Sequence, residues 1–324
     1  MISRPAPYQL SPIAAAVALF SVYLAPLFKE VLEADSYAAG AGSTVARVID
    51  GSLHDYPMTG IAGVANIGTD RNWTGHHFGQ SNWYAFGRLA WDHTLSAERI
   101  VEEWTRMTFS NDPEVVASVP AIMTASREAP VNYMTSLGLA HLLAANHHYG
   151  PGPWVDESWE GGRRADWNAV YYHRADTLGI GFDRTASGSD AFSQYHPPVR
   201  DRWSNRETVP DSLLLWFHRV RWDERLRSGR TLWEEMVHRC QAGVETVRWM
   251  QRSWDALEGK IDERHFRGVQ AFLRIQEREA RWWRDSSTLY FQQFARMPIP
   301  EGYDRPEHTL EHYMCIRSRY VPGI

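Results

Sequence analysis

Apolar residues recur at helical spacing over several segments of the chain, and suitable capping residues precede them. Ser96 begins one such segment, and Asp112-Pro113 combines a cap with proline at the first helical position of the next. These patterns predict helices from Ser96 onward and over 113–126, the latter kinked at Pro120. The apolar segment 132–145 predicts a third helix.

Two long helices are predicted near the C-terminus. Thr231 and Glu234 match a capping box for a helix that reaches about Leu257. Asp262 is the expected cap of a second helix, which reaches about Met297. A short Gly-Lys turn joins the two into a helical hairpin. Because such a pair exposes a wide flank, it is a candidate dimer surface.

A different pattern covers residues 60–92. Residues 60–66 predict a buried strand, a polar and aromatic loop follows, and the apolar spacing over 82–91 predicts a helix. A strand, a polar loop and a helix in this order are typical of the wall of an α/β barrel. Ahead of this stretch, short helices are predicted over 26–35 and over 43–49, the second capped by Ser43.

Residues 1–28 combine a charged start with an apolar centre, which resembles a signal peptide. Prolines interrupt this segment, and no convincing small-residue cleavage site follows it promptly. We therefore favour an apolar piece of a protein core over a signal peptide. The segment is also too short and too broken to span a membrane.

Composition narrows the possible functions. The 324 residues suffice for roughly two domains, and they are 44% hydrophobic and 23% charged, as in globular proteins. The net charge is −5 without any basic stripe, so nucleic acid is not an expected partner. Cys240 and Cys315 fit neither a disulfide framework nor a zinc spacing and are expected to be free thiols in a reducing compartment. The 15 Trp, 14 Tyr and 12 Phe suit a carbohydrate enzyme, and they equally suit an ordinary large core.

Glycine and proline punctuate residues 147–185, and a second loop-rich segment follows over 186–210. Long ordered loops are more often functional than short ones. The first segment carries Trp154, Trp159 and Trp167, which makes it the more informative of the two.

Three motifs are long enough to be specific. They are GIAGVAN at 60–66 continuing to NWTGHHF at 72–78, HHYGPGPW at 147–154, and RADW at 164–167 followed by YYHRAD at 171–176 and GIGFDR at 179–184. Through these motifs the chain, from about Leu24 onward, closely resembles the carboxy-terminal part of the α-glucuronidases of glycoside hydrolase family 67.

The resemblance implies a fold and an activity. Enzymes of this family remove α-1,2-linked glucuronic acid or its 4-O-methyl ether from xylo-oligosaccharides, with inversion and without a metal or other cofactor. The implied fold is mainly α, a C-terminal helical domain preceded by the last strand or strands and helices of a (β/α)8 TIM barrel. Residues 1–70 would be the remnant of the barrel, and residues 71–324 the helical domain, starting with the last barrel loop and helix. The implied partners are a glucuronoxylo-oligosaccharide and a second copy of the chain, bound through the C-terminal helices.

The first 23 residues depart from the family pattern. The family's catalytic acid and base precede the region matched here, and the last of them is a glutamate in an Arg-Glu-Pro segment ahead of a Ser-Pro pair. In this chain Ser11-Pro12 is present, but Ala6-Pro7-Tyr8-Gln9 precedes it without a glutamate. We therefore expect a fragment that has no glycosidase activity alone. The alternative is a non-catalytic helical module that dimerises or contacts sugar. A cytoplasmic location is expected, with periplasmic or extracellular locations as alternatives.

Candidate substrate-binding residues follow from the resemblance. The family places a carboxy-domain tryptophan over the sugar pocket, and Trp154 is the first choice, with Trp167 and ordinary packing as alternatives. Four further residues follow the predicted last barrel strand and are expected at the barrel mouth, or else as loop anchors: Asn72, Trp73, His76 and His77.

Other constellations point to structural roles. The histidine pairs 76–77 and 147–148, with His173, suggest a zinc site, but the family resemblance implies no metal. Trp282-Trp283 is expected in the core or in the dimer interface. The following acidic and basic residues are expected to form structural ion pairs with one another: Asp166, Asp176, Asp183, Arg164, Arg174 and Arg184.

Overall fold

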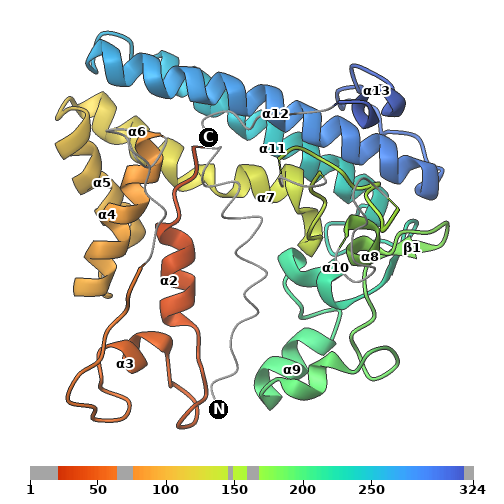
Figure 1. Cartoon of the computed structure of the whole chain (residues 1–324), viewed down its shortest axis with the longest axis horizontal. Helices are drawn as coiled ribbons and strands as arrows, with labels where there is room; N and C mark the ends of the chain where they lie inside the picture. Colours follow the sequence, from red (N-terminus) through yellow and green to blue (C-terminus); the bar gives the residue numbers. More distant parts are fainter. Residues whose placement is uncertain (1–20, 64–75, 145–148, 159–167, 317–324) are drawn as a thin grey trace.

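A computed structural model describes residues 21–63, 76–144, 149–158 and 168–316 of the chain. The described part is mainly helical, as predicted (Figure 1). The two longest helices, α11 (Leu232–Asp255) and α12 (Glu263–Ala295), pack along each other, and α7 (Glu128–Met134) contacts both of them. Their predicted caps are confirmed. Thr231 and Glu234 form the capping box of α11, and the Asp262 side chain accepts a hydrogen bond from His265 N at the start of α12.

The N-terminal part differs from the predicted barrel wall. It contains α2 (Ala25–Glu33), α3 (Val45–Ile49) and α4 (His77–Trp91). Thr44, not Ser43, caps α3, because the Ser43 hydroxyl instead donates to Gly40 O and holds a turn. The predicted strand over 60–66 is wrong for 60–63, which are exposed and outside any strand, and the rest of it lies outside the described residues. In the described ranges we find no barrel strand.

The next helices confirm the predicted caps. Ser96 caps α5 (Ala97–Thr108), and Asp112 caps α6 (Pro113–Ser126), which contains Pro120. The predicted third helix over 132–145 is wrong. The structure has α7 (Glu128–Met134) and the 3-10 turn η1 (Ser136–Gly138), followed by buried extended chain. Gly138 explains why the helical stretch ends here, because its φ is 87° and a Cβ at this position would lie 2.8 Å from Ser212 O.

Residues 149–158 and 168–221 form loops held by short elements. In chain order these are α8 (Ala169–His173), β1 (Gly179–Ile180), η2 (Ala191–Gln194), α9 (Pro197–Ser204), η3 (Asp211–Leu213), α10 (Leu214–Phe217) and β2 (Val220–Arg221). β1 and β2 pair antiparallel, with Gly179 opposite Arg221. A Cβ at Gly179 would lie 2.2 Å from Val220 O, so this close approach requires glycine.

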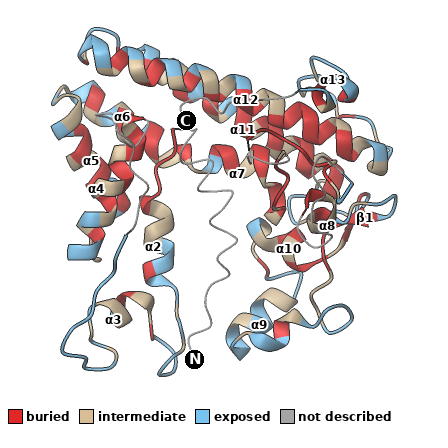
Figure 2. Ribbon diagram, viewed as in Figure 1, coloured by how far each residue is buried: buried red, intermediate tan, exposed pale blue. Residues whose placement is uncertain are grey.

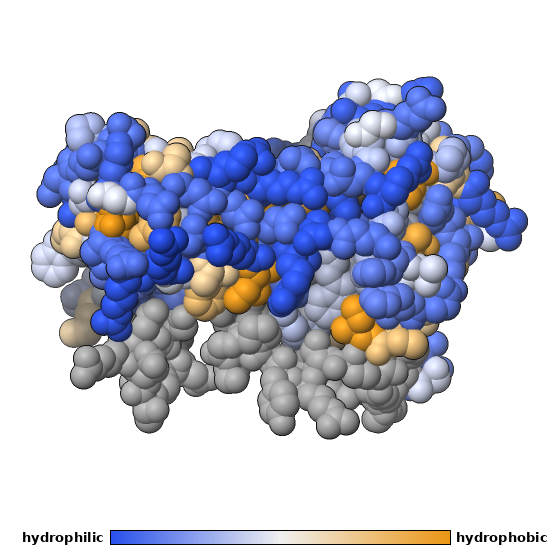
Figure 3. Space-filling model, turned by 90° about the horizontal axis from the view of Figure 1, so that it is seen from above, coloured by the Kyte–Doolittle hydropathy of each residue, from blue (hydrophilic) through white to orange (hydrophobic). Residues whose placement is uncertain are grey.

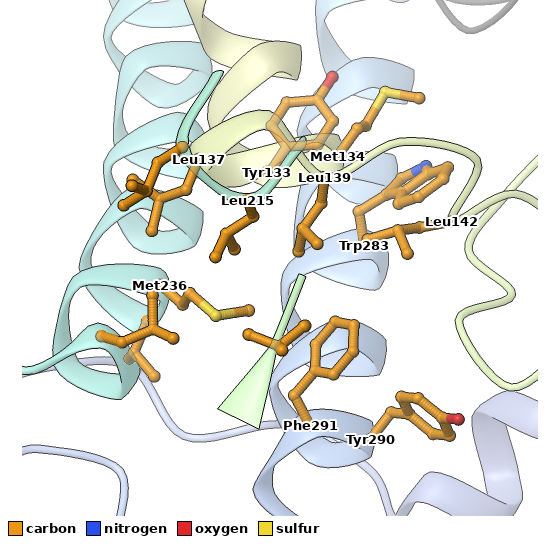
Figure 4. Packing of buried hydrophobic residues seen from close by; sticks show 14 of the residues in the cluster. Tyr133, Met134, Leu137, Leu139, Leu142, Leu215, Met236, Trp283, Tyr290 and Phe291 are labelled. Atoms are coloured by element: carbon orange, nitrogen blue, oxygen red, sulfur yellow. The ribbon is translucent and has the colours of Figure 1, made fainter. Parts of the chain in front are cut away.

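Two hydrophobic cores lie along the α11–α12 pair (Figure 2). One joins α2, α4, α5 and α6 to the end of α11 and the start of α12, around Trp254 and Phe266. The other joins the loop region to the start of α11 and the end of α12 (Figure 4), and Trp283 and Phe291 are buried in it. The small helix α13 (Leu310–Met314) packs on this second core. None of the helices that the structure describes combines the length and the hydropathy needed to cross a bilayer.

Candidate functional site

His76 and His77 lie at the start of α4. His76 is buried and caps the helix, with Gly79 N donating to its Nδ1 at 3.1 Å. His77 borders a cavity of about 70 Å³ that is also lined by Ser21, Gly268 and Phe272. Burial and, to a smaller extent, the nearby His265 together lower the pKa of His77 to about 4. Both rings therefore belong to a packed region in which His77 is neutral at pH 7.

Trp154 lies in the other core region, partly buried against Tyr290 with ring centroids 6.4 Å apart. The neighbouring His173 fixes the loop that carries it. His173 Nε2 donates to Pro153 O at 2.9 Å, while its Nδ1 accepts from Ala175 N at 2.9 Å. Burial lowers the pKa of His173 to about 4. Because both ring nitrogens are engaged, His173 is a loop anchor rather than a metal ligand.

The predicted substrate residues do not meet at one place in this chain. The His77 ring contacts His265 and the Trp154 ring contacts Tyr290, both on α12. With a rise of about 1.5 Å per residue, the part of α12 between them is about 37 Å long. Trp154 and the α4 histidines therefore cannot face the same sugar unit. Asn72, Trp73 and Trp167 lie outside the described residues.

The predicted ion pairs in the loop region are wrong for the described residues. Asp176 binds Arg219 at 2.6 Å. Asp183 accepts from its own downstream neighbours, Thr185 and Ser187, and holds a turn. These hydrogen bonds lower the pKa of Asp183. Asp166 and Arg164 lie outside the described residues. Both local carboxylates are thus engaged elsewhere, which leaves Arg174 and Arg184 with different neighbours.

Arg174 and Arg184 contact aromatic rings instead. The Arg184 guanidinium carbon lies 4.3 Å from the ring centroids of both Phe182 and Trp216. The Arg174 guanidinium carbon lies 4.6 Å from the Phe182 centroid and 5.0 Å from that of Tyr171. We call the following set the arginine–aromatic cluster: Tyr171, Tyr172, Arg174, Phe182, Arg184 and Trp216.

Backbone bonds hold the cluster together. Phe182 N donates to Leu215 O at 3.2 Å and Arg184 N donates to Phe217 O at 3.0 Å, which fixes residues 182–184 beside α10. Gly181 makes the turn possible, since its φ is 100° and a Cβ would lie 2.4 Å from His218 O. On α8, Tyr172 stacks on Trp216 with an interplanar angle of 11°. The cluster is therefore built from three chain segments in fixed positions.

Among the residues that the structure describes, Arg184 forms no salt bridge with an aspartate or a glutamate. Its Nε donates to Trp216 O at 2.7 Å, and burial lowers its pKa. Every other arginine that is at least partly buried in the described ranges forms a salt bridge with an aspartate or glutamate. Sequence reasoning missed the cluster because it assigned the nearby aspartates to these arginines. The Asp-x-Thr-x-Ser spacing at 183–187 was the available signal that Asp183 holds its own turn.

The described residues offer no metal centre, because no three His, Cys, Asp or Glu side chains there are placed to hold an ion. Three buried acids do occur, and each is paired with arginine. Glu235 binds Arg230 and Arg239, Glu279 binds Arg278, and Asp285 binds Arg284. What the loop region offers chemically is a cationic and aromatic surface rather than an acid and a base.

Comparisons with known proteins identify the family. The family model described as "Glycosyl hydrolase family 67 C-terminus" matches residues 74–304, and the "Glycosyl hydrolase family 67 middle domain" matches residues 16–73. Alpha-glucuronidase A of Emericella nidulans is 37% identical over 283 residues, which are 87% of this chain and 32% of that protein. Probable alpha-glucuronidase A of Neosartorya fischeri is 37% identical over 273 residues, 84% of this chain and 32% of that protein. The chain spans about a third of the length of these curated relatives. The chain belongs to glycoside hydrolase family 67.

Proposed function

We propose that this chain serves as the C-terminal part of a xylan α-1,2-glucuronidase, an inverting glycoside hydrolase. The reaction would release glucuronic or 4-O-methylglucuronic acid from glucuronoxylo-oligosaccharides. The observation that carries the proposal is the pair of adjoining family matches, which meet between residues 73 and 74. The relatives are named alpha-glucuronidases, and they match across most of this chain.

We further propose that this chain alone does not catalyse the reaction. An inverting glycosidase needs two carboxyl groups about 6.5–9.5 Å apart, with a water molecule between them. In the described residues the buried carboxylates are all committed to arginines, and Asp285 also accepts from the Tyr313 hydroxyl at 2.7 Å. A carboxylate held by arginine stays ionised, so it is a poor general acid. The acid and the base are therefore expected to come from outside the described part of the chain.

The role left for this chain is to supply one wall of the sugar pocket. Trp154 is the proposed wall residue, because it is partly buried on the anchored loop after Pro153. A non-catalytic sugar-contacting module is the matching alternative for the chain in isolation. The cationic and aromatic surface around Arg184 and Trp216 favours that alternative over a purely structural role.

The test is a glucuronic acid release assay with aldotetraouronic acid and the pure chain, together with a binding titration of the same sugar. We expect binding and no release above the level of heat-denatured protein. Release that rises in proportion to protein concentration would overturn the proposed inactivity. Failure of wild-type protein to bind the sugar would overturn the sugar-contacting role. A Trp154→Ala variant that keeps wild-type affinity would remove Trp154 from the wall.

A homodimer through α11 and α12 is part of the same proposal. Trp249 on α11 is 37% exposed, while the face seen along α12 in Figure 3 is mainly hydrophilic. An interface there would combine polar contacts with few aromatic anchors, as in many non-obligate complexes. Sedimentation equilibrium over a concentration series should give twice the mass of the chain. A constant mass of one chain would reject this part of the proposal.

A further inference from the structure

The arginine–aromatic cluster has the features of a binding surface. Arg174 is exposed and Arg184 is partly exposed, so ligands from solvent can reach both guanidinium groups. On the Arg184 guanidinium, Nε donates to Trp216 O, and no described residue accepts a hydrogen bond from Nη1 or Nη2. These two groups form the fork that binds a carboxylate in bidentate geometry.

The electrostatics favour an anion at this surface. Arg174 is close enough to lower the pKa of Arg184, so two like charges lie beside the same Phe182 ring. Neither nearby aspartate forms a salt bridge with Arg174 or Arg184 within the described residues, because Asp176 binds Arg219 and Asp183 accepts from Thr185 and Ser187. A ligand carboxylate between two guanidinium groups would relieve the repulsion and form charge-assisted hydrogen bonds.

The rings indicate what else the ligand carries. Trp216, Tyr171 and Tyr172 are each partly exposed, and Tyr172 and Trp216 stack nearly parallel at 6.1 Å. Arg184 lies over one face of Trp216, and Tyr172 stacks on both Trp216 and His141, so these faces are partly occupied within the protein. Partly exposed aromatic rings beside a guanidinium suit a ligand that carries an apolar surface next to its anionic group, such as the C–H groups of a pyranose. A small carboxylate such as acetate would bind the arginines without contacting the aromatic rings.

We propose that the arginine–aromatic cluster binds a carboxylated sugar, with Arg184 on the carboxylate and the solvent-exposed parts of Trp216 and Tyr171 beside the sugar ring. Arg174 adds a second positive charge. The preference for an anion rests on the geometry of the cluster alone. The choice of a sugar acid rests on the proposed function, and it extends that function to residues for which the sequence predicted only ion pairs.

The test uses the full chain and three small probes: sodium glucuronate, glucose and sodium acetate. Tryptophan fluorescence titration gives the affinities, and saturation-transfer NMR reports which sugar protons lie on protein. We expect glucuronate to bind at least about tenfold more tightly than glucose or acetate, because only glucuronate uses both the guanidinium fork and the rings. Raising the salt concentration should weaken glucuronate binding.

Matched variants assign the binding to the cluster. Arg184→Met keeps the length of the side chain and should weaken glucuronate binding at least about tenfold. Arg252→Met removes an exposed arginine from α11 and should change the affinity by less than about twofold. Should Arg184→Met fail to fold, Arg184→Lys serves in its place. It keeps the charge but loses the fork, and should weaken binding by several-fold.

Three results would overturn the proposal. They are equal affinity for glucuronate and glucose, equal affinity for glucuronate and acetate, and unchanged glucuronate affinity in a folded Arg184 variant. None of these results would change the outcome expected for the glucuronic acid release assay. Glucuronic acid release by the pure chain would contradict the proposed inactivity without bearing on the cluster.

Discussion

Arg284 and Arg184 lie in two regions that handle a buried positive charge in opposite ways. Arg284, on α12, is only 4% exposed and binds Asp285 and Asp304, while its Nη1 also donates to Gln241. Arg184, in the loop region, is partly buried against two aromatic rings and forms no salt bridge with any described residue. In Arg284, all three guanidinium nitrogens bind acceptors within the protein. In Arg184, only Nε has an acceptor among the described residues.

This difference separates structural charge from functional charge. Buried ion pairs are costly to break, because removal of one partner leaves an uncompensated charge. A cation that the fold leaves without a counter-charge is a candidate for binding an external anion. The α12–α13 network around Arg284 is therefore expected to govern stability, and the arginine–aromatic cluster to govern ligand binding.

The largest expected effect is on the α12 network. Arg284→Met leaves Asp285, which is 1% exposed, without its cation. We expect the free energy of unfolding to fall by about 3–5 kcal/mol. Urea denaturation followed by circular dichroism measures the change. A loss below about 1 kcal/mol would mean that the network does not stabilise the fold.

The next effect depends on pH and concerns His173. Its pKa is about 4 in the folded chain and about 6.5 in an unfolded one. Between these values the unfolded chain binds a proton that the folded chain does not, so the free energy of unfolding falls as the pH falls. The expected loss from pH 7 to pH 4 is about 3 kcal/mol.

His173→Asn is the matched variant for this pH effect. Asparagine retains a short acceptor for Ala175 N but has no side-chain proton to take up. The variant should lose less stability on acidification than the wild type, as measured by urea denaturation at pH 7 and pH 4. Parallel pH profiles for the two proteins would show that His173 is not the group responsible.

A smaller effect is expected for Arg184→Met. The substitution removes two cation–π contacts, yet it also removes a partly buried charge without a counter-charge. These contributions oppose each other, so the free energy of unfolding should stay within about 1 kcal/mol of wild type. Thermal and urea denaturation check this. If Arg184→Met lowered the free energy of unfolding as much as Arg284→Met, Arg184 would stabilise the fold in the same way as Arg284.

The smallest effect is expected for an exposed pair. Arg106 and Glu102 lie one helical turn apart on α5 at 2.9 Å, with side chains 44% and 35% exposed. Arg106→Met should change the free energy of unfolding by no more than about 0.5 kcal/mol. A loss above about 1 kcal/mol would show that pairing alone, rather than burial, makes an arginine structural here.

Local capping signals predicted the starts of four helices correctly, whereas the predicted cap Ser43 was wrong because Thr44 caps α3. Ser96, Asp112, Thr231 and Asp262 cap their helices as expected, because each bond depends only on residues within one turn. The break after Met134 was not predictable, since it depends on Gly138 packing against residue 212, far away in sequence. The strand over 60–63 failed because a short apolar run does not reveal whether neighbouring strands exist to pair with it.

The candidate site was less predictable than the fold. The sequence predicted that Trp154 lies in a loop-rich segment, whereas its distance from His77 depends on the length of α12 between their contacts. Partners for Arg174 and Arg184 were misassigned because aspartates near in sequence were assumed to be near in space. Asp176 and Asp183 instead accept hydrogen bonds from the backbone N–H groups of Leu178 and Thr185. Only the three-dimensional structure reveals these bonds.

The most direct test of this division is to measure stability and glucuronate affinity together for Arg184→Met and Arg284→Met. We expect Arg184→Met to keep its free energy of unfolding and lose glucuronate affinity. We expect Arg284→Met to lose stability and, under conditions where it remains folded, to bind glucuronate as the wild type does. The account would be contradicted if both variants lost stability with unchanged affinity, or if affinity fell equally in both.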